Sequence, residues 1–181
     1  MREIRDLDLM EETVDRKRIV IASVVIPAVL ILILVVAFMT IPSLTIEPTM
    51  TGIIGGIALT VVLLVVHELI HGLFFRLLSP PGTPITFGFS NGMIFASAEG
   101  QVYPKMSYAV IVAAPFVVIS LALIASSLVP GSRTAALLAI VLHTSGCAGD
   151  LYYLWVMATD PRITHAEDTS RGVTFYEQLS A

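Results

Sequence analysis

Three side chains that can bind a metal or move a proton stand close together in residues 61–75, VVLLVVHELIHGLFF. His67 and His71 are four residues apart, so on a helix both imidazoles lie on the same face, one above the other. Two such nitrogens can bind one zinc ion. Glu68 is turned by about 100° around the helix, which places it beside the metal to act on a bound water. The spacing predicts His67 and His71 as zinc ligands and Glu68 as general base.

The composition places this motif in a membrane protein. Of the 181 residues, 56% are hydrophobic and only 13% are charged, and the mean hydropathy is +0.88, whereas soluble domains carry about 25% charged residues. An Asp, Lys or Arg at membrane depth costs about 2.5 to 3.5 kcal/mol on insertion scales, so ionisable groups there usually serve a function. The lipid setting therefore strengthens the metal-site interpretation of the motif.

Long apolar stretches predict four transmembrane helices, each near the roughly 20 residues needed to cross a bilayer. They cover about 19–41, 51 to the paired Pro80 and Pro81, 107–129 and 134–158. Gly52 and Gly56 have the small-xxx-small spacing that lets another helix approach closely. The expected fold class is an all-α polytopic membrane protein. Residues 1–18 are expected to be a charged cytoplasmic segment, 19–158 a four-helix transmembrane metalloprotease domain, and 159–181 a partly ordered cytoplasmic tail.

One non-helical element is expected, between the second and third helices. In residues 83–105, Asn91 and Gly92 separate two short runs of apolar residues, which is a strong signal for a two-residue β-hairpin turn. We expect this hairpin at the inner membrane face. Placing both termini in the cytoplasm puts nine of the ten Lys and Arg residues inside, all except Arg133, as the positive-inside rule requires.

A hydrolytic zinc site needs a third protein ligand and one open position. At about 1.5 Å per residue, His67 lies about 24 Å down the second helix, and Asp150 lies about 24 Å down the fourth. Asp150 is therefore the predicted third ligand. Asp160 lies about 15 Å away from that level, and Glu99 belongs to the hairpin loop.

Two other residues near Asp150 leave alternatives open. Cys147 is one turn from Asp150 and could bind zinc or simply pack. His143, about 10 Å nearer the outside, could support the ligands, line a cavity, bind metal or pack. Gly146 and Gly149 flank this stretch, and their lack of side chains is expected to let the second helix come close.

The segments HELIHG and GCAGDLYYLW, with the glycine-containing hairpin between them, resemble the site-2 protease class of intramembrane zinc metalloproteases, in particular a small prokaryotic zincin peptidase group. The resemblance covers about residues 51–158. It implies that His67, His71 and Asp150 bind zinc and that Glu68 is the general base. The chain departs from the larger members in having Leu151 where they have Gly after the Asp, and it lacks the Asn and Pro that often precede that Asp.

The function expected from these residues is zinc-dependent hydrolysis of peptide bonds in membrane-embedded or membrane-proximal proteins. Zinc would activate a water and polarise the scissile carbonyl, and Glu68 would shuttle the proton. The hairpin edge could hold an extended substrate, and Asn91 could donate to the oxyanion or serve only as a turn residue. A non-proteolytic membrane metal-binding protein for transport or sensing, or an inactive scaffold, are the alternatives.

The expected partners follow from this interpretation. They are a membrane protein or peptide substrate and the lipid bilayer, with no nucleic acid and with no oligomeric state indicated. The expected location is a prokaryotic cell membrane.

Overall fold

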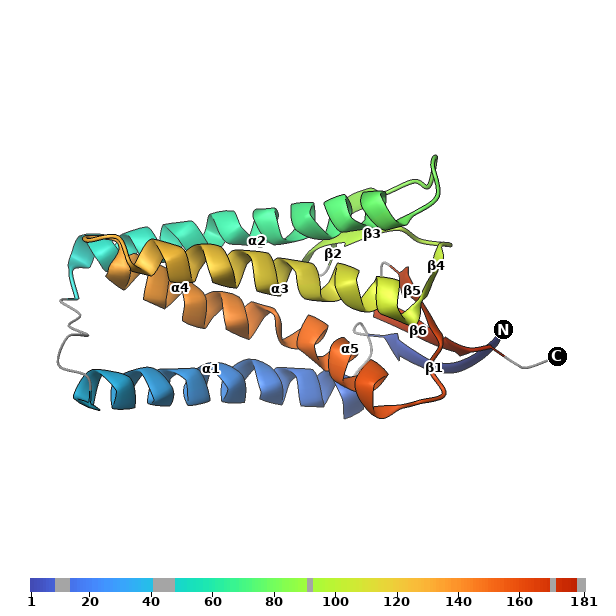
Figure 1. Cartoon of the computed structure of the whole chain (residues 1–181), viewed down its shortest axis with the longest axis horizontal. Helices are drawn as coiled ribbons and strands as arrows, with labels where there is room; N and C mark the ends of the chain where they lie inside the picture. Colours follow the sequence, from blue (N-terminus) through green and yellow to red (C-terminus); the bar gives the residue numbers. More distant parts are fainter. Residues whose placement is uncertain (9–13, 41–47, 91–92, 170–171, 179–181) are drawn as a thin grey trace.

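A computed structural model of the chain describes residues 1–8, 14–40, 48–90, 93–169 and 172–178. Five helices and six strands follow one another along these residues (Figure 1). In chain order they are β1 (Arg2–Asp8), α1 (Val14–Thr40), α2 (Met50–Leu78), β2 (Thr86–Ser90), β3 (Met93–Ser97), β4 (Val102–Pro104), α3 (Lys105–Ser127), α4 (Arg133–Gly146), α5 (Ala148–Thr159), β5 (His165–Thr169) and β6 (Gly172–Glu177).

Three helices, α1, α2 and α3, are each long and apolar enough to cross a membrane, and α4 with α5 makes a fourth crossing if the two count as one broken span. The expected continuous helix over 134–158 is wrong. The helix breaks at Cys147, and α5 turns from α4 by 52°. The second helix, α5, begins at Ala148, so Asp150 lies in its first turn.

Close packing between α2 and α4 confirms the prediction made from Gly52 and Gly56. A Cβ atom built on Gly56 would lie 3.0 Å from the carbonyl oxygen of Ala135, and one built on Gly52 would lie 2.8 Å from the side chain of Thr134. The expectation for Gly146 and Gly149 is wrong, because a Cβ on either would meet nothing within 4 Å. These two glycines border open space instead of a neighbouring helix.

The chain is not all-α, because its two ends form a sheet with β4. The strand order is β1-β6-β5-β4, with every neighbouring pair antiparallel. The sheet lies at one end of the helices, and β1 and β6 lie next to each other there (Figure 1). Val173 and Phe175 of β6 are fully buried and belong to the main apolar core together with residues of α3 and α5. The segments before and after the helices thus form a sheet that packs against one end of the helical bundle.

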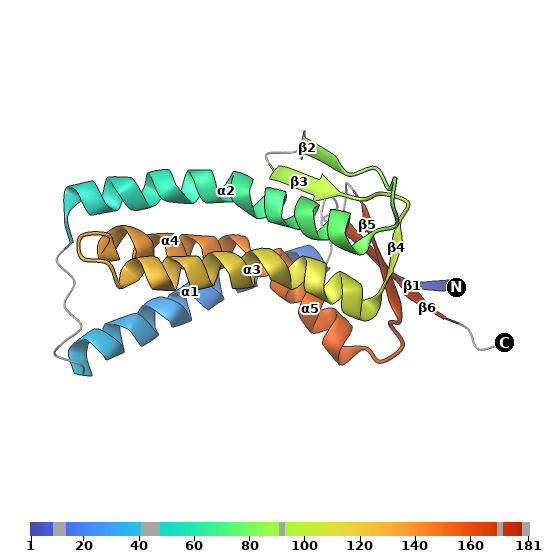
Figure 2. The ribbon, with the colours of Figure 1, turned by 45° about the horizontal axis from the view of Figure 1, so that its top comes forward.

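The strands β2 and β3 pair antiparallel between α2 and α3, with Phe87 opposite Ala96. Asn91 and Gly92, the expected turn, lie outside the described residues. Figure 2 shows the two strands beside the second half of α2, the half that carries His67 and His71. The side chain of Phe87 fills the space over Gly72, where a Cβ would lie 2.2 Å from the ring.

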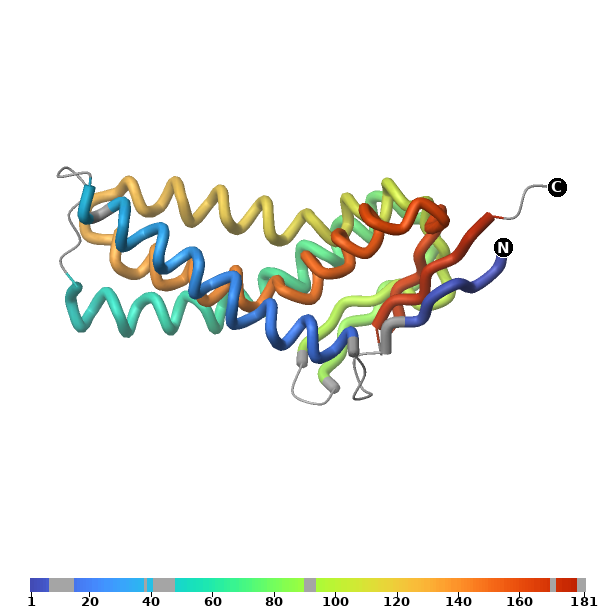
Figure 3. Tube along the Cα trace, turned by 90° about the horizontal axis from the view of Figure 1, so that it is seen from below, coloured from blue at the N-terminus to red at the C-terminus, as the bar shows by residue number. Residues whose placement is uncertain are grey.

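Helix α1 packs on α4 and α5, as seen from below in Figure 3. Pro27 has no N–H to donate to the carbonyl of Ser23 four residues earlier, and the hydroxyl of Ser145 in α4 donates to that carbonyl at 2.6 Å. At the sheet end, Asp15 of α1 accepts hydrogen bonds from Arg5 of β1 at 2.6 Å and from Tyr152 of α5 at 2.5 Å. The first helix is therefore fixed by polar contacts at two levels.

Replacing Gly56 by Ala should lower the stability of the protein, because the new methyl group would press on the backbone of α4. Overpacking of this kind costs about 1 to 3 kcal/mol, which outweighs the gain of about 1 kcal/mol in helix propensity. Gly55→Ala is the matched control, since a Cβ there lies 3.8 Å from Ala135, at ordinary contact distance. Thermal unfolding in detergent should show a lower midpoint for Gly56→Ala only; equal midpoints would contradict the packing described.

Candidate metal centre

The C-terminal half of α2 carries His67, Glu68 and His71, and the two imidazoles meet as their spacing predicts. The Nε2 atoms of His67 and His71 lie 3.1 Å apart. The ring centroids are 4.7 Å apart and the rings stand at 75° to each other. Apolar α2 residues on the other faces, such as Val65 and Leu69, are about half exposed, as expected for a helix in contact with lipid. The two nitrogens therefore converge on the inner face of the bundle.

Asp150 joins the two histidines from the first turn of α5. Its Oδ2 atom lies 3.1 Å from Nε2 of His67 and 3.5 Å from Nε2 of His71. The depth arithmetic placed Asp150 at this level, and the structure brings it there. Because α5 begins at Ala148, its unpaired N-terminal N–H groups also favour a negative charge at this position. Ligation of a metal by the three residues remains a prediction.

The three donor atoms fit a zinc ion. Zinc ligands at about 2.0 to 2.1 Å in tetrahedral geometry lie about 3.4 Å from one another, and the three distances are 3.1, 3.1 and 3.5 Å. Oδ2 of Asp150 is buried and has no hydrogen-bond partner among the described residues. A buried, unpartnered carboxylate oxygen facing two imidazole nitrogens would be costly without a cation. The geometry and the donor types both suit zinc.

The ring of His71 is oriented by a carbonyl that a proline leaves free. Nδ1 of His71 lies 3.1 Å from the carbonyl oxygen of Ile111 in α3. In a regular helix that carbonyl would accept from residue 115, but residue 115 is proline and has no N–H. His71 can therefore donate from Nδ1 and keep the lone pair of Nε2 for a metal, an arrangement typical of zinc-binding histidines.

Glu68 lies beside His67, His71 and Asp150 and is held in place by the strand β3. Its Oε2 atom accepts a hydrogen bond of 2.7 Å from the backbone N–H of Ala96. Since this N–H is used by Glu68, it points away from β2. The contact fixes the carboxylate between the helix and the outer edge of β3, next to the imidazoles but outside the set of three converging donor atoms.

The remaining candidates lie in different places. His143 and Cys147 contact the other side of the His67 ring, with 5.7 Å between the centroids of His143 and His67. Asp160 ends α5 and pairs with Arg162 at 2.7 Å, and Glu99 is exposed after β3. Neither residue is part of the wall of the cavity that contains His67, His71 and Asp150. The possible oxyanion donor Asn91 lies outside the described residues.

A cavity of about 540 Å³ contains the candidate centre. Apolar side chains of α2, α3 and β3 form much of its wall, and Asp168 of β5 lies in the wall at the sheet end. Asp168 accepts a hydrogen bond of 2.8 Å from the hydroxyl of Tyr108. Burial raises the pKa of the Asp168 carboxyl to about 7, although the hydroxyls of Tyr108 and Ser97 act in the opposite direction.

Asp168 is not among the residues predicted from the sequence, because residues 159–181 are expected to form a partly ordered tail. The signal was present: GVTFYE combines β-branched and aromatic residues, which favours a strand. The polar segment HAEDT precedes it, and the two residues between them are enough for a β-hairpin turn. Recognising this strand pair would have placed the acid of β5 on a sheet rather than in solvent.

Comparison with known proteins gives the family. Residues 60–164, more than half of the chain, match the family described as "Putative zincin peptidase", and the chain belongs to this family. The match contains the motif on α2 and Asp150, and its description indicates a zinc-dependent peptidase. No curated protein and no solved structure matches the chain.

Pro115→Ala should weaken zinc binding although residue 115 does not touch the centre. The new N–H at residue 115 would bond the carbonyl of Ile111 and compete with Nδ1 of His71. Loss of such an orienting contact typically costs about 10- to 100-fold in metal affinity. Competition with a chromogenic chelator measures the affinity. Pro27→Ala, which changes the corresponding carbonyl in α1, is the control and should leave zinc affinity unchanged; an equal loss in both variants would contradict the role of Pro115.

The raised pKa of Asp168 should make the folded protein less stable as pH rises from about 4 to about 7. Over this range the unfolded chain has already lost the proton that the folded chain still holds, so rising pH favours unfolding. The effect is on the order of 2 to 4 kcal/mol. Thermal midpoints across pH should fall over this range in the unsubstituted protein and fall less in Asp168→Asn. Tyr108→Phe should extend the fall to higher pH; a pH profile unchanged in both variants would contradict the assignment.

Proposed function

We propose that this member of the family is an intramembrane zinc peptidase of the site-2 protease type. His67, His71 and Asp150 would hold the zinc ion, and Glu68 would be the general base. The observation that carries the proposal is the convergence of three donor atoms within 3.1 to 3.5 Å of one another inside an apolar helical bundle, with a carboxylate fixed beside them.

The position of the centre supports cleavage near one membrane face. His67 and His71 lie in the second half of a helix long enough to span a bilayer, and that half ends at the sheet. Arg76, Lys105 and Arg162 lie at this end, and Arg133 is the first residue of α4 at the other. By the positive-inside rule the sheet end would face the cytoplasm, so both termini would be cytoplasmic. The substrate would then be cut on the cytoplasmic side of a prokaryotic cell membrane.

The chemistry divides between the metal and the side chains around it. Zinc, when bound, lowers the pKa of a coordinated water to about 7 and polarises the scissile carbonyl. Glu68 would accept the proton of the attacking water on one carboxylate oxygen while Ala96 holds the other. The same carboxylate would then give the proton to the leaving amine, because general bases of this kind return the proton in the second half of the reaction. His71 would stay in place through its bond to Ile111.

The outer edge of β3 would hold the substrate in an extended form. Because the N–H of Ala96 points to this edge, the N–H and C=O of Ile94, two residues earlier, point there as well. A peptide added as a further strand would pair with Ile94 and run past Glu68. This suits a membrane-spanning substrate, since its helix must unwind before its peptide bonds are accessible. The apolar wall of the cavity, which includes Leu63 and Phe95, would receive its side chains.

Glu68→Gln should abolish peptide cleavage and leave the zinc content unchanged, because the side chain moves a proton and does not bind the metal. Loss of a general base lowers the rate by about 10²- to 10⁴-fold. The assay co-expresses the protein with a panel of single-span membrane proteins tagged at both ends and follows release of the tags. Glu99→Gln, an exposed carboxylate, is the matched control. Asp150→Ala should lose cleavage together with the zinc ion bound by His67 and His71.

Either of two outcomes would contradict this function. Cleavage retained in Glu68→Gln would refute the general-base assignment. Stable zinc binding without cleavage of any panel member by the unsubstituted protein would favour a metal-binding protein for transport or sensing.

A further inference from the structure

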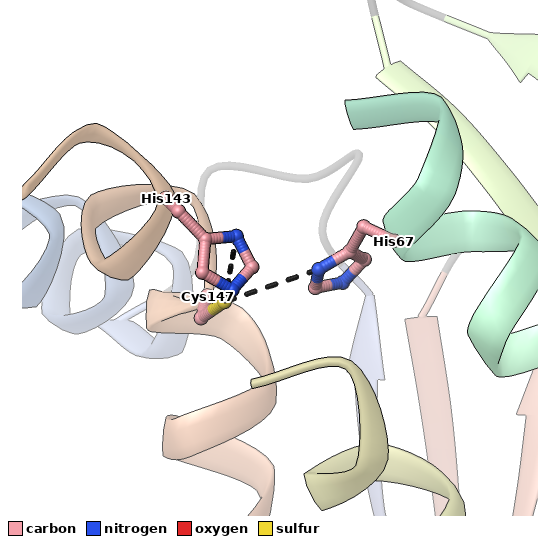
Figure 4. Close-up of side chains that lie close together, drawn as sticks. All are labelled: His67, His143 and Cys147. Carbon is pink, nitrogen blue, oxygen red and sulfur yellow. Dashed lines mark hydrogen bonds between the residues drawn. The ribbon is translucent and has the colours of Figure 1, made fainter. Parts of the chain in front are cut away.

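A second group of metal-binding side chains lies on the opposite side of the His67 ring. Cys147 stands at the break between α4 and α5, and His143 lies one turn earlier in α4. The sulfur of Cys147 is 3.4 Å from Nε2 of His143 and 3.9 Å from Nδ1 of His67 (Figure 4). We propose that His67, His143 and Cys147 form a second metal site, for a thiophilic transition-metal ion, that shares His67 with the candidate zinc centre.

The distances suit a single ion between the three residues. With Zn–S of about 2.3 Å and Zn–N of about 2.0 to 2.1 Å, tetrahedral geometry separates sulfur from nitrogen by about 3.6 Å. The two observed sulfur-to-nitrogen distances, 3.4 and 3.9 Å, lie on either side of this value. All three ligand atoms lie within 4.8 Å of one another. An ion bound by all three would draw the nitrogens of His67 and His143 to about 3.4 Å from each other, the separation of two nitrogen ligands in tetrahedral geometry.

The donor types select the class of metal. One thiolate and two imidazoles make a soft set, which favours zinc, copper(I) or related ions over magnesium and calcium, both of which prefer oxygen ligands. The candidate zinc centre on the other side of His67 has two imidazoles and a carboxylate instead. The two sites would therefore differ in their preference for soft metal ions.

The surroundings allow an ion to enter and retain it. Cys147 is fully buried and His143 is only 6% exposed, so bound metal would be shielded from water. His143 and Gly146 nevertheless lie in the wall of the cavity, and a Cβ on Gly146 would meet nothing within 4 Å. The open space beside Gly146 provides the path that a buried metal site requires.

His67 can serve both sites because its two ring nitrogens face different ligands. Nε2 points to His71 and Asp150, and Nδ1 points to Cys147. With both sites filled, the ring of His67 would act as an imidazolate that binds one ion through each nitrogen. The thiol of Cys147 and the ring N–H of His67 then each release one proton to the solvent. This second site does not depend on whether the protein cleaves peptides.

Cobalt(II) titration of the purified full-length protein in detergent tests the proposal. The unsubstituted protein should bind two cobalt ions per chain and develop a thiolate-to-cobalt charge-transfer band, because Cys147 is its single cysteine. Cys147→Ser should bind one ion and show no band. His143→Ala should weaken the band-forming step at least tenfold. His165→Ala, which changes the histidine of β5, is the control and should behave like the unsubstituted protein.

Asp150→Ala separates this proposal from the proposed function. It should lose one cobalt ion and keep the band, since it changes only the neighbouring centre; if it keeps both ions, the zinc centre is wrong and the second site stands. Absence of the band from the unsubstituted protein overturns the second site, as does its loss in Asp150→Ala. X-ray absorption of the zinc-loaded, unsubstituted protein provides a measurement without any variant: sulfur at about 2.3 Å is expected, and its absence overturns the proposal.

Discussion

Polar side chains inside an apolar helical bundle must satisfy one another, because lipid provides no hydrogen bonds. This constraint governs the arrangement around His67. The two histidines of α2, the carboxylate of Asp150 and the carboxylate of Glu68 come from different turns and helices, and each faces another of the group or a backbone group. Their mutual contacts explain how an otherwise aliphatic helix can carry three ionisable residues within five positions, 67–71.

Two prolines extend the same principle to the backbone. Pro27 and Pro115 each leave one carbonyl without its helical donor, and in both cases a polar side chain of another helix takes its place: Ser145 in the first and His71 in the second. In lipid such a carbonyl would otherwise remain unpaired at a cost of several kcal/mol. The prolines of α1 and α3 thus join helices together, and in α3 the joint also orients a candidate metal ligand.

The helices and the metal-binding motif could be predicted from the sequence, and the pairing of the two chain ends could not. Apolar runs of about 20 residues have few alternatives to spanning helices, so three of the four predicted spans match α1, α2 and α3. Strand β1 consists mostly of charged residues, and it pairs with β6, about 170 residues away. Local patterns contain no information about pairing over such a distance, which is why residues 1–18 were expected to be a flanking arm. The segments of β5 and β6 carry a local strand signal, but nothing local joins them to β1.

For the site, the sequence by itself determined the chemistry of the donors: His67 and His71 share a helix face because four residues make about one turn, and Asp150 matches them in depth. Only the tertiary structure decided which atoms meet. The 52° break at Cys147 brings Asp150 to one nitrogen of His67 and the sulfur of Cys147 to the other, and folding of β5 places Asp168 in the same cavity. The spacing of residues along one helix fixes the directions in which their side chains point. The distances between side chains on different helices depend instead on how all the helices pack together.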